Sequence, residues 1–434
     1  MAPLKNHKTR TTYSRRGVIG GGVAVASAAM LGASWSARRS FAAQVSGDIS
    51  VRFFPFGTGV EDLYAEFKDE FEAQNPDVKV NLDLQPWDNR YPKMLADIAA
   101  GQGPDVMFVT TDVLIRFSQA DAIVPLDFLL PAELWSGYEQ KYIDEVSLDG
   151  SKWYLPFDKE VPLWLINKDI YEQSGLDPAV LPANWDDLRG VCETVKSAGD
   201  DMIFGWGYQA AAGTLNTTFY PFLVQAGGRP ISEDGTTATF NSPEGVEALT
   251  FITELFTNGW ASQQYMQPIQ DGQDPFILGT QAVSLEIFVN GLKTQKAQAP
   301  ELNYALTPML GHKQQAGFGG MRSWAISKES KNPEAAAALV NFLSNPEINR
   351  RHCEMFGTFP AGTEALAASY QGDTEMAEIA THLEFTFGEQ KHKYGRDLMP
   401  LVIPEIQAAI IGEKTPQQAL DDAASAVNEL FAQG

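Results

Sequence analysis

The sequence predicts an α/β protein whose strands are mainly parallel. Strand and helix patterns alternate from residue 48 onward, which is typical of βαβ units. The chain has 434 residues, a length that favours two domains over one. It is 44% apolar and 20% charged, as expected of a globular protein with a large core.

Hydrophobic periodicity predicts the first five elements. Residues 48–57 form a buried strand that ends in a turn, and residues 78–84 form a strictly alternating strand. A third buried strand covers 105–109 and ends abruptly at polar residues. The two intervening helices each carry an apolar face, formed by Leu63, Phe67 and Phe71 in the first and by Tyr91, Met94, Leu95 and Ile98 in the second.

Polar or glycine-rich segments follow all three strands. They are Phe56-Gly57-Thr58-Gly59, Trp87-Asp88 and Thr110-Thr111-Asp112. Ligands of open α/β sheets bind outside the carboxyl ends of the strands, so we expect a site there. Asp112 has two interpretations that the sequence leaves open, an N-cap of the next helix or a ligand contact.

The second half is punctuated by helix starts. Four segments place a capping residue before a proline at the first helical position: Asn241 to Gly245, Asn332 to Ala336, Asn345 to Asn349 and Thr415 to Ala419. The last helix carries Leu420, Ala424, Val427 and Phe431 on one face. No repeat or obvious linker separates the domains, which suggests that the chain crosses between them several times.

The first 42 residues resemble an export signal. They hold seven Lys and Arg, no acid, and a weakly apolar run rich in Gly and Ala. Arg15 and Arg16 follow Ser14 and resemble a twin-arginine signal, and Ser40 and Ala42 suit a cleavage site. We therefore expect export to the periplasm. A membrane anchor that stays attached is the alternative.

Composition and motifs exclude several classes of function. Residues 43–434 carry 25 basic and 55 acidic side chains, a negative field that disfavours nucleic acid and anionic lipid. No later stretch is long and apolar enough to span a bilayer. There is no nucleophile elbow, phosphate loop or zinc-protease motif, and no histidine has metal spacing. We expect no catalytic site, no metal and no cofactor, although a pair of glycosidase carboxylates is not excluded.

Aromatic side chains indicate a carbohydrate ligand. Nine tryptophans are present, and Trp87, Trp206 and Trp324 fall at predicted strand ends or turns. Sugars present apolar C–H faces edged by hydroxyls, so flat aromatic walls beside planar polar groups suit them. Core packing is the other explanation for each of these tryptophans.

Six segments resemble, in family order, the extracellular solute-binding proteins of ABC importers, a large family dominated by sugar binders. The most informative is WYLPFDKEVPLWLINKDIYEQSGLDP at 153–178, which matches at Pro156, Asn167, Lys168 and Ser174-Gly175-Leu176. The other segments are GQGPDVMF (101–108), PANWDDL (182–188), FILGTQAVSLE (276–286), the stretch at 318–347 and IIGEKTPQQALDDAASAVNEL (410–430). Together they span nearly the whole mature chain.

The resemblance implies a two-lobed periplasmic binding protein fold (type II), with two α/β lobes joined by three hinge crossings. The crossings would fall near Asp158 to Pro162, Gly319 to Ser323 and Tyr370 to Met376. We expect a signal peptide at 1–42, an N-terminal lobe at 43–158 and 324–370, and a C-terminal lobe at 159–323 and 371–434. Cys192 and Cys353 would then lie in different lobes, where a disulfide would lock the hinge, so we expect free thiols.

The resemblance also implies the ligand-binding residues. Asp112 and Glu160 match positions of hydroxyl-binding acids, and Asp158 neighbours Glu160. Phe288 lies where an aromatic wall is often found. The full expected set is Trp87, Tyr91, Asp112, Asp158, Glu160, Glu286, Phe288, Gly320 and Arg322.

The implied function is a monomeric periplasmic binding protein that closes over a small mono- or oligosaccharide and delivers it to the transmembrane subunits of an ABC permease, without catalysis. One alternative is a non-sugar solute such as a polyol phosphate, a polyamine or an amino-acid-like molecule. An anionic solute would need more cations than Arg322, whereas a cationic one would suit Asp112, Asp158 and Glu160. Another alternative is a secreted carbohydrate-active enzyme.

Overall fold

The structure, a computed structural model, describes residues 45–55, 59–87, 90–200, 203–207, 214–262, 266 and 274–433. The expected signal peptide, Phe56 to Thr58 and Asp88 lie outside the described residues, so their predicted roles stay predictions. Within these ranges, none of the helices combines the length and apolarity that crossing a membrane requires.

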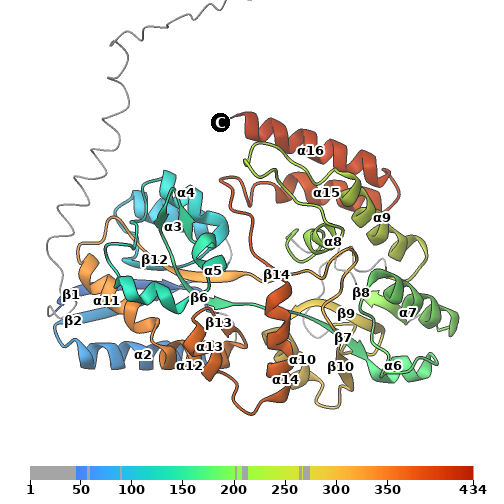
Figure 1. The fold of residues 1–434 in the computed structure, drawn as a ribbon, viewed down its shortest axis with the longest axis horizontal. Helices are drawn as coiled ribbons and strands as arrows, with labels where there is room; N and C mark the ends of the chain where they lie inside the picture. Colours follow the sequence, from blue (N-terminus) through green and yellow to red (C-terminus); the bar gives the residue numbers. More distant parts are fainter. Residues whose placement is uncertain are drawn as a thin grey trace, which may run out of the picture. The chain divides into compact units, whose positions relative to one another are not determined.

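The first main sheet has six strands in the order β13-β6-β12-β3-β1-β2 (Figure 1). Its strands are β1 (Gly47–Phe53), β2 (Val78–Leu84), β3 (Val106–Thr110), β6 (Leu155–Lys159), β12 (Met321–Ile326) and β13 (Phe359–Pro360). β1 runs parallel to β2 and β3, but β12 lies antiparallel between β3 and β6. The mainly parallel sheet that we predicted is therefore mixed, because two strands return from late in the chain.

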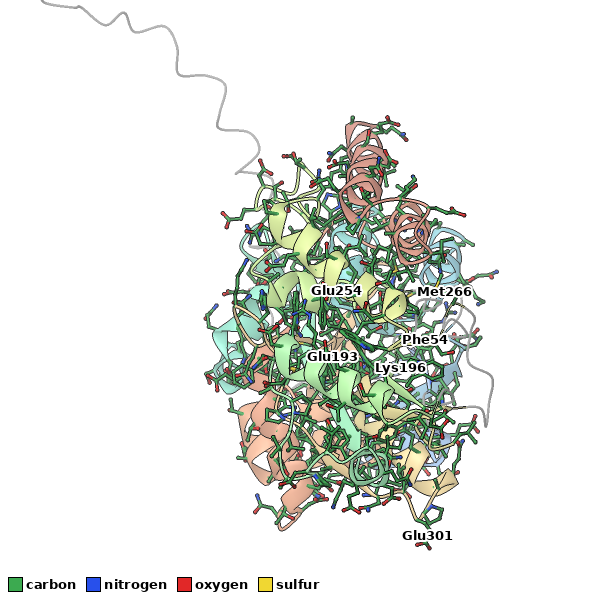
Figure 2. All side chains as sticks on the ribbon, turned by 90° about the vertical axis from the view of Figure 1, so that its right-hand side faces the viewer. Phe54, Glu193, Lys196, Glu254, Met266 and Glu301 are labelled. Carbon is green, nitrogen blue, oxygen red and sulfur yellow. The ribbon has the colours of Figure 1, made fainter. Side chains whose placement is uncertain are left out.

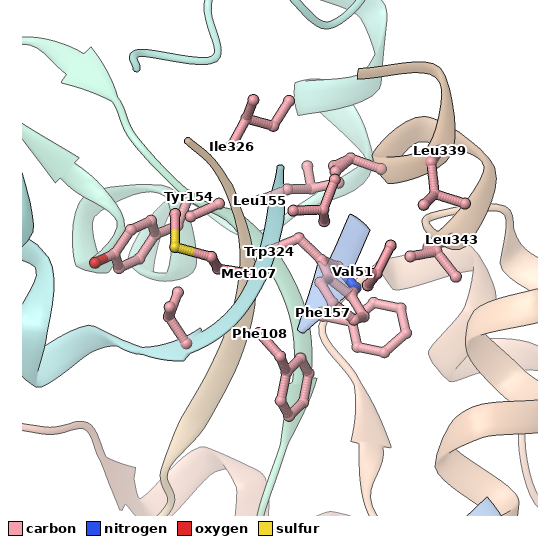
Figure 3. Close-up of a cluster of buried hydrophobic side chains, with 14 of the residues drawn as sticks. Val51, Met107, Phe108, Tyr154, Leu155, Phe157, Trp324, Ile326, Leu339 and Leu343 are labelled. Atoms are coloured by element: carbon pink, nitrogen blue, oxygen red, sulfur yellow. The ribbon is translucent and has the colours of Figure 1, made fainter. Parts of the chain in front are cut away.

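Large aromatic side chains fill the core behind this sheet. Phe108 of β3, Phe157 of β6 and Trp324 of β12 lie side by side (Figure 3), with ring centroids 4.9 Å apart for Phe108–Trp324 and 5.4 Å apart for Phe157–Trp324. Trp324 is fully buried in this cluster. The prediction that Trp324 lies at a strand end was wrong. Trp324 lies within β12, and its role is core packing.

The second main sheet has the strand order β10-β7-β9-β8. Its strands are β7 (Pro162–Asn167), β8 (Phe204–Gly207), β9 (Gln281–Phe288) and β10 (Tyr304–Leu306). Only β8 and β9 are parallel among these pairs. Trp206 is fully buried here beside Trp164, so it too is a core residue.

Helices cover both sheets. Figure 2 looks onto α7 (Trp185–Ser197) and α9 (Pro243–Thr257), with Glu193 and Lys196 of α7 and Glu254 of α9 labelled. The remaining helical elements are α2 (Val60–Gln74), α3 (Arg90–Ala99), η1 (Thr111–Val113), α4 (Leu114–Gln119), η2 (Ala132–Gly137), α5 (Gln140–Glu145), α6 (Lys168–Gln173), α8 (Tyr220–Gln225), α10 (Val289–Gln298), α11 (Pro333–Leu343), α12 (Pro346–Phe356), α13 (Thr363–Ala368), α14 (Thr374–Ala380), η4 (Thr381–Phe385), α15 (Met399–Ile410) and α16 (Pro416–Ala432).

The chain passes from the first sheet to the second between β6 and β7, through Glu160 and Val161 alone. It returns through β11 (Gly317–Phe318), which pairs with β14 (Thr386–Phe387) and immediately precedes β12. A further two-stranded sheet joins β4 (Ser147–Leu148) to β5 (Ser151–Lys152). Residues near both sheets therefore lie close together at the β6–β7 and β11–β12 passages.

The predicted helix starts are mostly confirmed. The side chains of Ser242, Asn345 and Thr415 accept backbone N–H bonds at the starts of α9, α12 and α16, and Thr415 forms a full capping box with Gln418. Asn332 is the exception, because its amide donates to the carbonyl oxygen of Asp48 instead.

Both cysteines are buried and free, as expected. Burial raises the pKa of each thiol well above its ordinary value, so neither is a reactive thiolate.

Candidate ligand-binding site

A pocket of about 330 Å³ lies where segments of the two sheets meet. It is lined by Trp87, Arg90, Thr110, Glu160, Asn290, Phe318, Gly320, Arg322 and Glu389. These residues come from the end of β2, the start of α3, the end of β3, the β6–β7 and β11–β12 passages, α10 and the segment after β14. Its volume is at the small end of the range for ligand sites.

The floor of the pocket contains an arginine held between two carboxylates. Arg322 Nε donates to Asp158 Oδ1 at 2.7 Å, and its Nη1 donates to Glu160 Oε1 at 2.8 Å. The sheet creates this arrangement, because Arg322 and Asp158 are register partners in β12 and β6 and the N–H of Glu160 donates to Gly320 O. A Cβ on Gly320 would lie 3.3 Å from Glu160 Oε2, so glycine leaves room for that carboxylate.

Asp158 lies behind this arginine and is fully buried. Its second oxygen, Oδ2, lies 2.7 Å from His352 Nε2 and accepts from Thr358 Oγ1 at 3.3 Å. Burial alone would raise the pKa of Asp158, but Arg322 and His352 hold that pKa below its usual value. Asp158 therefore orients Arg322 and has no oxygen open to a ligand. We call Asp158, Glu160, Arg322 and His352 the Arg322 cluster.

A second arginine lies between two carboxylates beside the same pocket. Arg396 Nε lies 2.5 Å from Asp112 Oδ2, and its Nη2 lies 3.9 Å from Glu389 Oε1. Glu389 Oε2 also accepts the backbone N–H of Asp112 at 3.1 Å. We call Asp112, Glu389 and Arg396 the Arg396 cluster.

Two hydroxyls extend this cluster toward the aromatic side. Thr110 Oγ1 donates its one hydrogen to Asp112 Oδ1 at 2.6 Å. The Tyr91 hydroxyl also lies 2.6 Å from Thr110 Oγ1, and because that hydrogen is already used, Tyr91 is the donor and Thr110 Oγ1 the acceptor. The Tyr91 oxygen in turn accepts the Thr110 N–H. The N-cap residue of α4 is Val113 and no side chain bonds that end, so the interpretation of Asp112 as a helix cap is wrong.

Glu389 has a raised pKa in this environment. Burial, followed by the charge of Asp112, raises the pKa of Glu389 well above its ordinary value, and Arg396 only partly opposes these two effects. Glu389 therefore holds a proton more readily than an exposed glutamate does.

Aromatic rings also line the pocket. Trp87 Nε1 donates to Pro55 O at 3.0 Å, and the Arg90 guanidinium lies over the rings of Trp87 and Tyr91. Phe318, at the end of β11, and Asn290, in the first turn of α10, line the pocket as well. The site therefore combines flat rings with planar polar groups.

The nine expected site residues fall into groups according to where they lie relative to the pocket. Trp87, Glu160, Gly320 and Arg322 line the pocket, while Tyr91, Asp112 and Asp158 lie behind lining residues. Phe288 ends β9 and is not a lining residue, and the side chain of Glu286 is outside the described part of the chain.

Sequence reasoning missed five side chains of this region: Arg90, Asn290, Phe318, Glu389 and Arg396. Arg90 follows Trp87-Asp88 closely, so extending that strand-end segment by two residues would have found it. Glu389 and Arg396 lie in the charged loop GEQKHKYGR at 388–396. A charged loop of that kind is itself a signal for function.

The paired charges narrow the class of solute. Arg322 pairs with both Asp158 and Glu160, and Arg396 pairs with Asp112. Each of the three acids that would suit a cationic ligand therefore already has an arginine partner. Over the described ranges, no group of three or more histidine, cysteine or acidic side chains is arranged to hold a metal ion.

A larger cavity of about 820 Å³ lies between α10, α12 and α14, away from these clusters. None of the expected site residues lines it. Four of its charged side chains form the ion pairs Lys296–Glu375 and Arg350–Glu354.

The strand orders, the short passages between the sheets and the pocket beside them define a two-lobed periplasmic binding protein fold. The solved structure of the sugar-binding protein MalE from Xanthomonas citri shares this fold, with a TM-score of 0.78 over 89% of this chain and 98% of that one, at 20% identity. The family model for bacterial extracellular solute-binding proteins matches residues 57–350, and the chain belongs to that family.

Two curated relatives extend the likeness over most of the chain. A Brucella abortus protein named as a binding protein is 24% identical over 393 residues, which cover 89% of this chain and 94% of the relative. The sn-glycerol-3-phosphate-binding periplasmic protein UgpB of Salmonella typhimurium is 26% identical over 420 residues, covering 88% of this chain and 93% of that protein.

Proposed function

We propose that this solute-binding protein captures a small carbohydrate in the periplasm and delivers it to the transmembrane subunits of an ABC permease. The observation that carries the proposal is the pocket itself, which Trp87 and Phe318 line together with Glu160 and Arg322. Rings suit the apolar faces of a sugar, and charged planar groups suit its hydroxyls. The sugar-binding MalE fold supports the same solute class.

Glu160 is the side chain best placed to accept a sugar hydroxyl. Arg322 occupies only its Oε1, and the side chain is 19% exposed toward the pocket. Because Arg322 is fixed by Asp158, Glu160 is oriented before the ligand arrives. Asp112 and Tyr91 support Thr110 from behind.

A thermal-shift screen over mono- and oligosaccharides tests the proposal. A sugar at 100 times its dissociation constant adds ~2.7 kcal/mol of stability, which raises the melting temperature. Lys93→Gln is a matched control, because Lys93 is exposed and pairs with Asp97 away from the pocket. A library without a single stabilising sugar would overturn the carbohydrate assignment.

A polyol phosphate is the second candidate. The likeness to the sn-glycerol-3-phosphate-binding protein UgpB favours it, and so do Arg90 and Arg322 in the pocket wall. Titration with sn-glycerol 3-phosphate and with glycerol separates it from a neutral sugar.

The relatives in this family are binding proteins of transporters, and we propose that this chain performs no chemistry either. Incubation with oligosaccharides tests this, since a binder returns them unchanged. Any cleaved or rearranged product would identify a carbohydrate-active enzyme instead.

The twin-arginine export of the chain belongs to the same proposal. Arg15→Lys with Arg16→Lys should trap the precursor in the cytoplasm, because a receptor reads this pair. Normal periplasmic accumulation of the double variant would show that the chain is exported by another route. Mass spectrometry of the mature protein checks cleavage after Ala42.

Closure over the ligand completes the proposal. We place the lobes at 43–158 with 324–370 and at 159–323 with 371–434, moving about the three crossings as a monomer. Small-angle scattering should show a smaller radius of gyration with saturating ligand and a mass of one chain. An unchanged radius would indicate a rigid binder.

A further inference from the structure

Among the described residues, Arg90 differs from the other two arginines of the site in having no acidic partner. Arg322 is bound by Asp158 and Glu160, and Arg396 by Asp112. Across the described ranges, no carboxylate lies within ion-pair distance of the Arg90 guanidinium, although that group lines the pocket.

The guanidinium of Arg90 is nevertheless held in place. Its Cζ lies 4.3 Å from the ring centroid of Trp87 and 4.5 Å from that of Tyr91, and Nη1 donates to Trp87 O at 3.1 Å. Its Nε is buried and has no hydrogen-bond partner in the described part of the chain. Rings that cover the faces of a guanidinium leave its N–H edge as the remaining donor.

Local structure does not explain this charge. Arg90 is the first residue of α3, where the positive end of the helix dipole disfavours a cation. Lys93, less than one turn later, is paired with Asp97 at 3.0 Å. A partly buried donor without a partner is costly, so a counter-group is expected from outside the chain.

We infer that Arg90 binds an anionic group of the ligand, a carboxylate or a phosphate, and that the solute is an acidic sugar. The inference rests on the proposed carbohydrate function and specifies its substrate class. A guanidinium fork matches both oxyanions with paired N–H bonds. Trp87 and Phe318 then cover the sugar ring, and Glu160 accepts one of its hydroxyls.

Calorimetric titration of the mature chain tests the inference. The probes are D-galacturonate, D-glucuronate and D-glucose 6-phosphate, each compared with its neutral parent, D-galactose or D-glucose. At least one acidic sugar should bind about tenfold or more tightly than its parent. The uronate and phosphate arms decide which oxyanion the protein selects.

Substitution of the arginine sharpens the test. Arg90→Gln should weaken binding of the preferred acidic sugar by about 10- to 100-fold and weaken binding of its neutral parent much less, because only the acidic sugar uses the charge. Lys93→Gln, on the same helix, should change the affinity for neither the acidic sugar nor its neutral parent. A thermal melt of each variant confirms that it is folded.

Two results would overturn the inference while leaving the proposed function intact. One is a neutral sugar that binds as tightly as its acidic counterparts, and the other is an Arg90→Gln variant that weakens both kinds equally. Failure of every acidic and neutral sugar to bind would instead overturn the proposed function.

Discussion

The Arg322 cluster and the Arg396 cluster use the same chemistry in different settings. Each holds one guanidinium near two carboxyl groups beside the pocket. Arg322 is 5% exposed and its partner Asp158 not at all, whereas Arg396 is 37% exposed. Register partners on adjacent strands fix the first cluster, but the second joins Asp112 to a loop 277 residues later.

The difference shows that similar ion pairs can have different roles in the same protein. The Arg322 cluster is part of the core and holds one pocket wall, so disrupting it threatens the fold. The Arg396 cluster rests on a loop and contains Glu389, whose pKa is raised in the folded state, so we expect its contribution to stability to depend on pH. The following predictions test that division.

The largest effect is expected from Asp158→Ala. It leaves Arg322 and His352 buried without their shared partner, which should cost ~3–5 kcal/mol of unfolding free energy. Urea denaturation followed by fluorescence measures it. A loss below about 1 kcal/mol would show that the cluster is no part of the core.

Ligand affinity should fall most with Glu160→Ala. Losing a charged acceptor for a sugar hydroxyl costs about 1.5–3 kcal/mol, or roughly ten- to a hundredfold in affinity. Asp112→Ala should have a smaller effect, because Asp112 acts through Thr110 and Arg396. Calorimetric titration with the ligand found by the screen compares them, and unchanged affinity in both variants would mean that the pocket is not the binding site.

The Arg396 cluster should make stability depend on pH. The folded pKa of Glu389 is raised, so the folded state keeps a proton that the unfolded state releases. Stability therefore falls as pH rises from the unfolded value of about 4.3 toward the folded pKa. Glu389→Gln removes this loss, so its stability relative to the native protein should increase with pH over that window.

Thermal melts from pH 4 to pH 8 measure this difference. Each unit by which the pKa is raised corresponds to about 1.4 kcal/mol. Glu413→Gln is the control, because Glu413 is exposed in the turn before α16. Parallel stability curves for Glu389→Gln and the native protein would contradict the prediction.

The smallest effect is expected from Asp397→Ala. Asp397 pairs with Arg116, and their side chains are 43% and 34% exposed. Water screens such a pair, so its loss should cost about 0–1 kcal/mol. Urea denaturation of the Asp397→Ala and Asp158→Ala variants compares the two losses of unfolding free energy. Losses of similar size would contradict the distinction between buried and exposed pairs.

Much of the fold could be predicted because its signals are local. β2 covers Val78–Leu84 as alternation predicted, and the apolar face of α2 includes Leu63, Phe67 and Phe71. The mixed sheet could not be predicted from pattern alone. The partners of β12 are set by pairing across a long sequence separation, which periodicity does not encode.

The site was predicted less completely for the same reason. Trp87, Glu160, Gly320 and Arg322 were found by position at strand ends and by family resemblance. Asp158 belongs to β6, a strand whose five residues are all buried, and its carboxylate lies behind Arg322. No local signal connects Asp112 to Arg396, because only the folded chain brings them together.

The place of β12 in the first sheet has a consequence for biosynthesis. β12 separates β3 from β6, yet Arg322 of β12 follows its partner Asp158 of β6 by 164 residues in the sequence. Until residue 326 has left the ribosome, β3 and β6 each present an unpaired edge to other nascent chains. Such non-local pairing slows folding and prolongs exposure to aggregation. The first sheet is therefore completed only after all four strands of the second have been synthesised, although its first strand begins at Gly47.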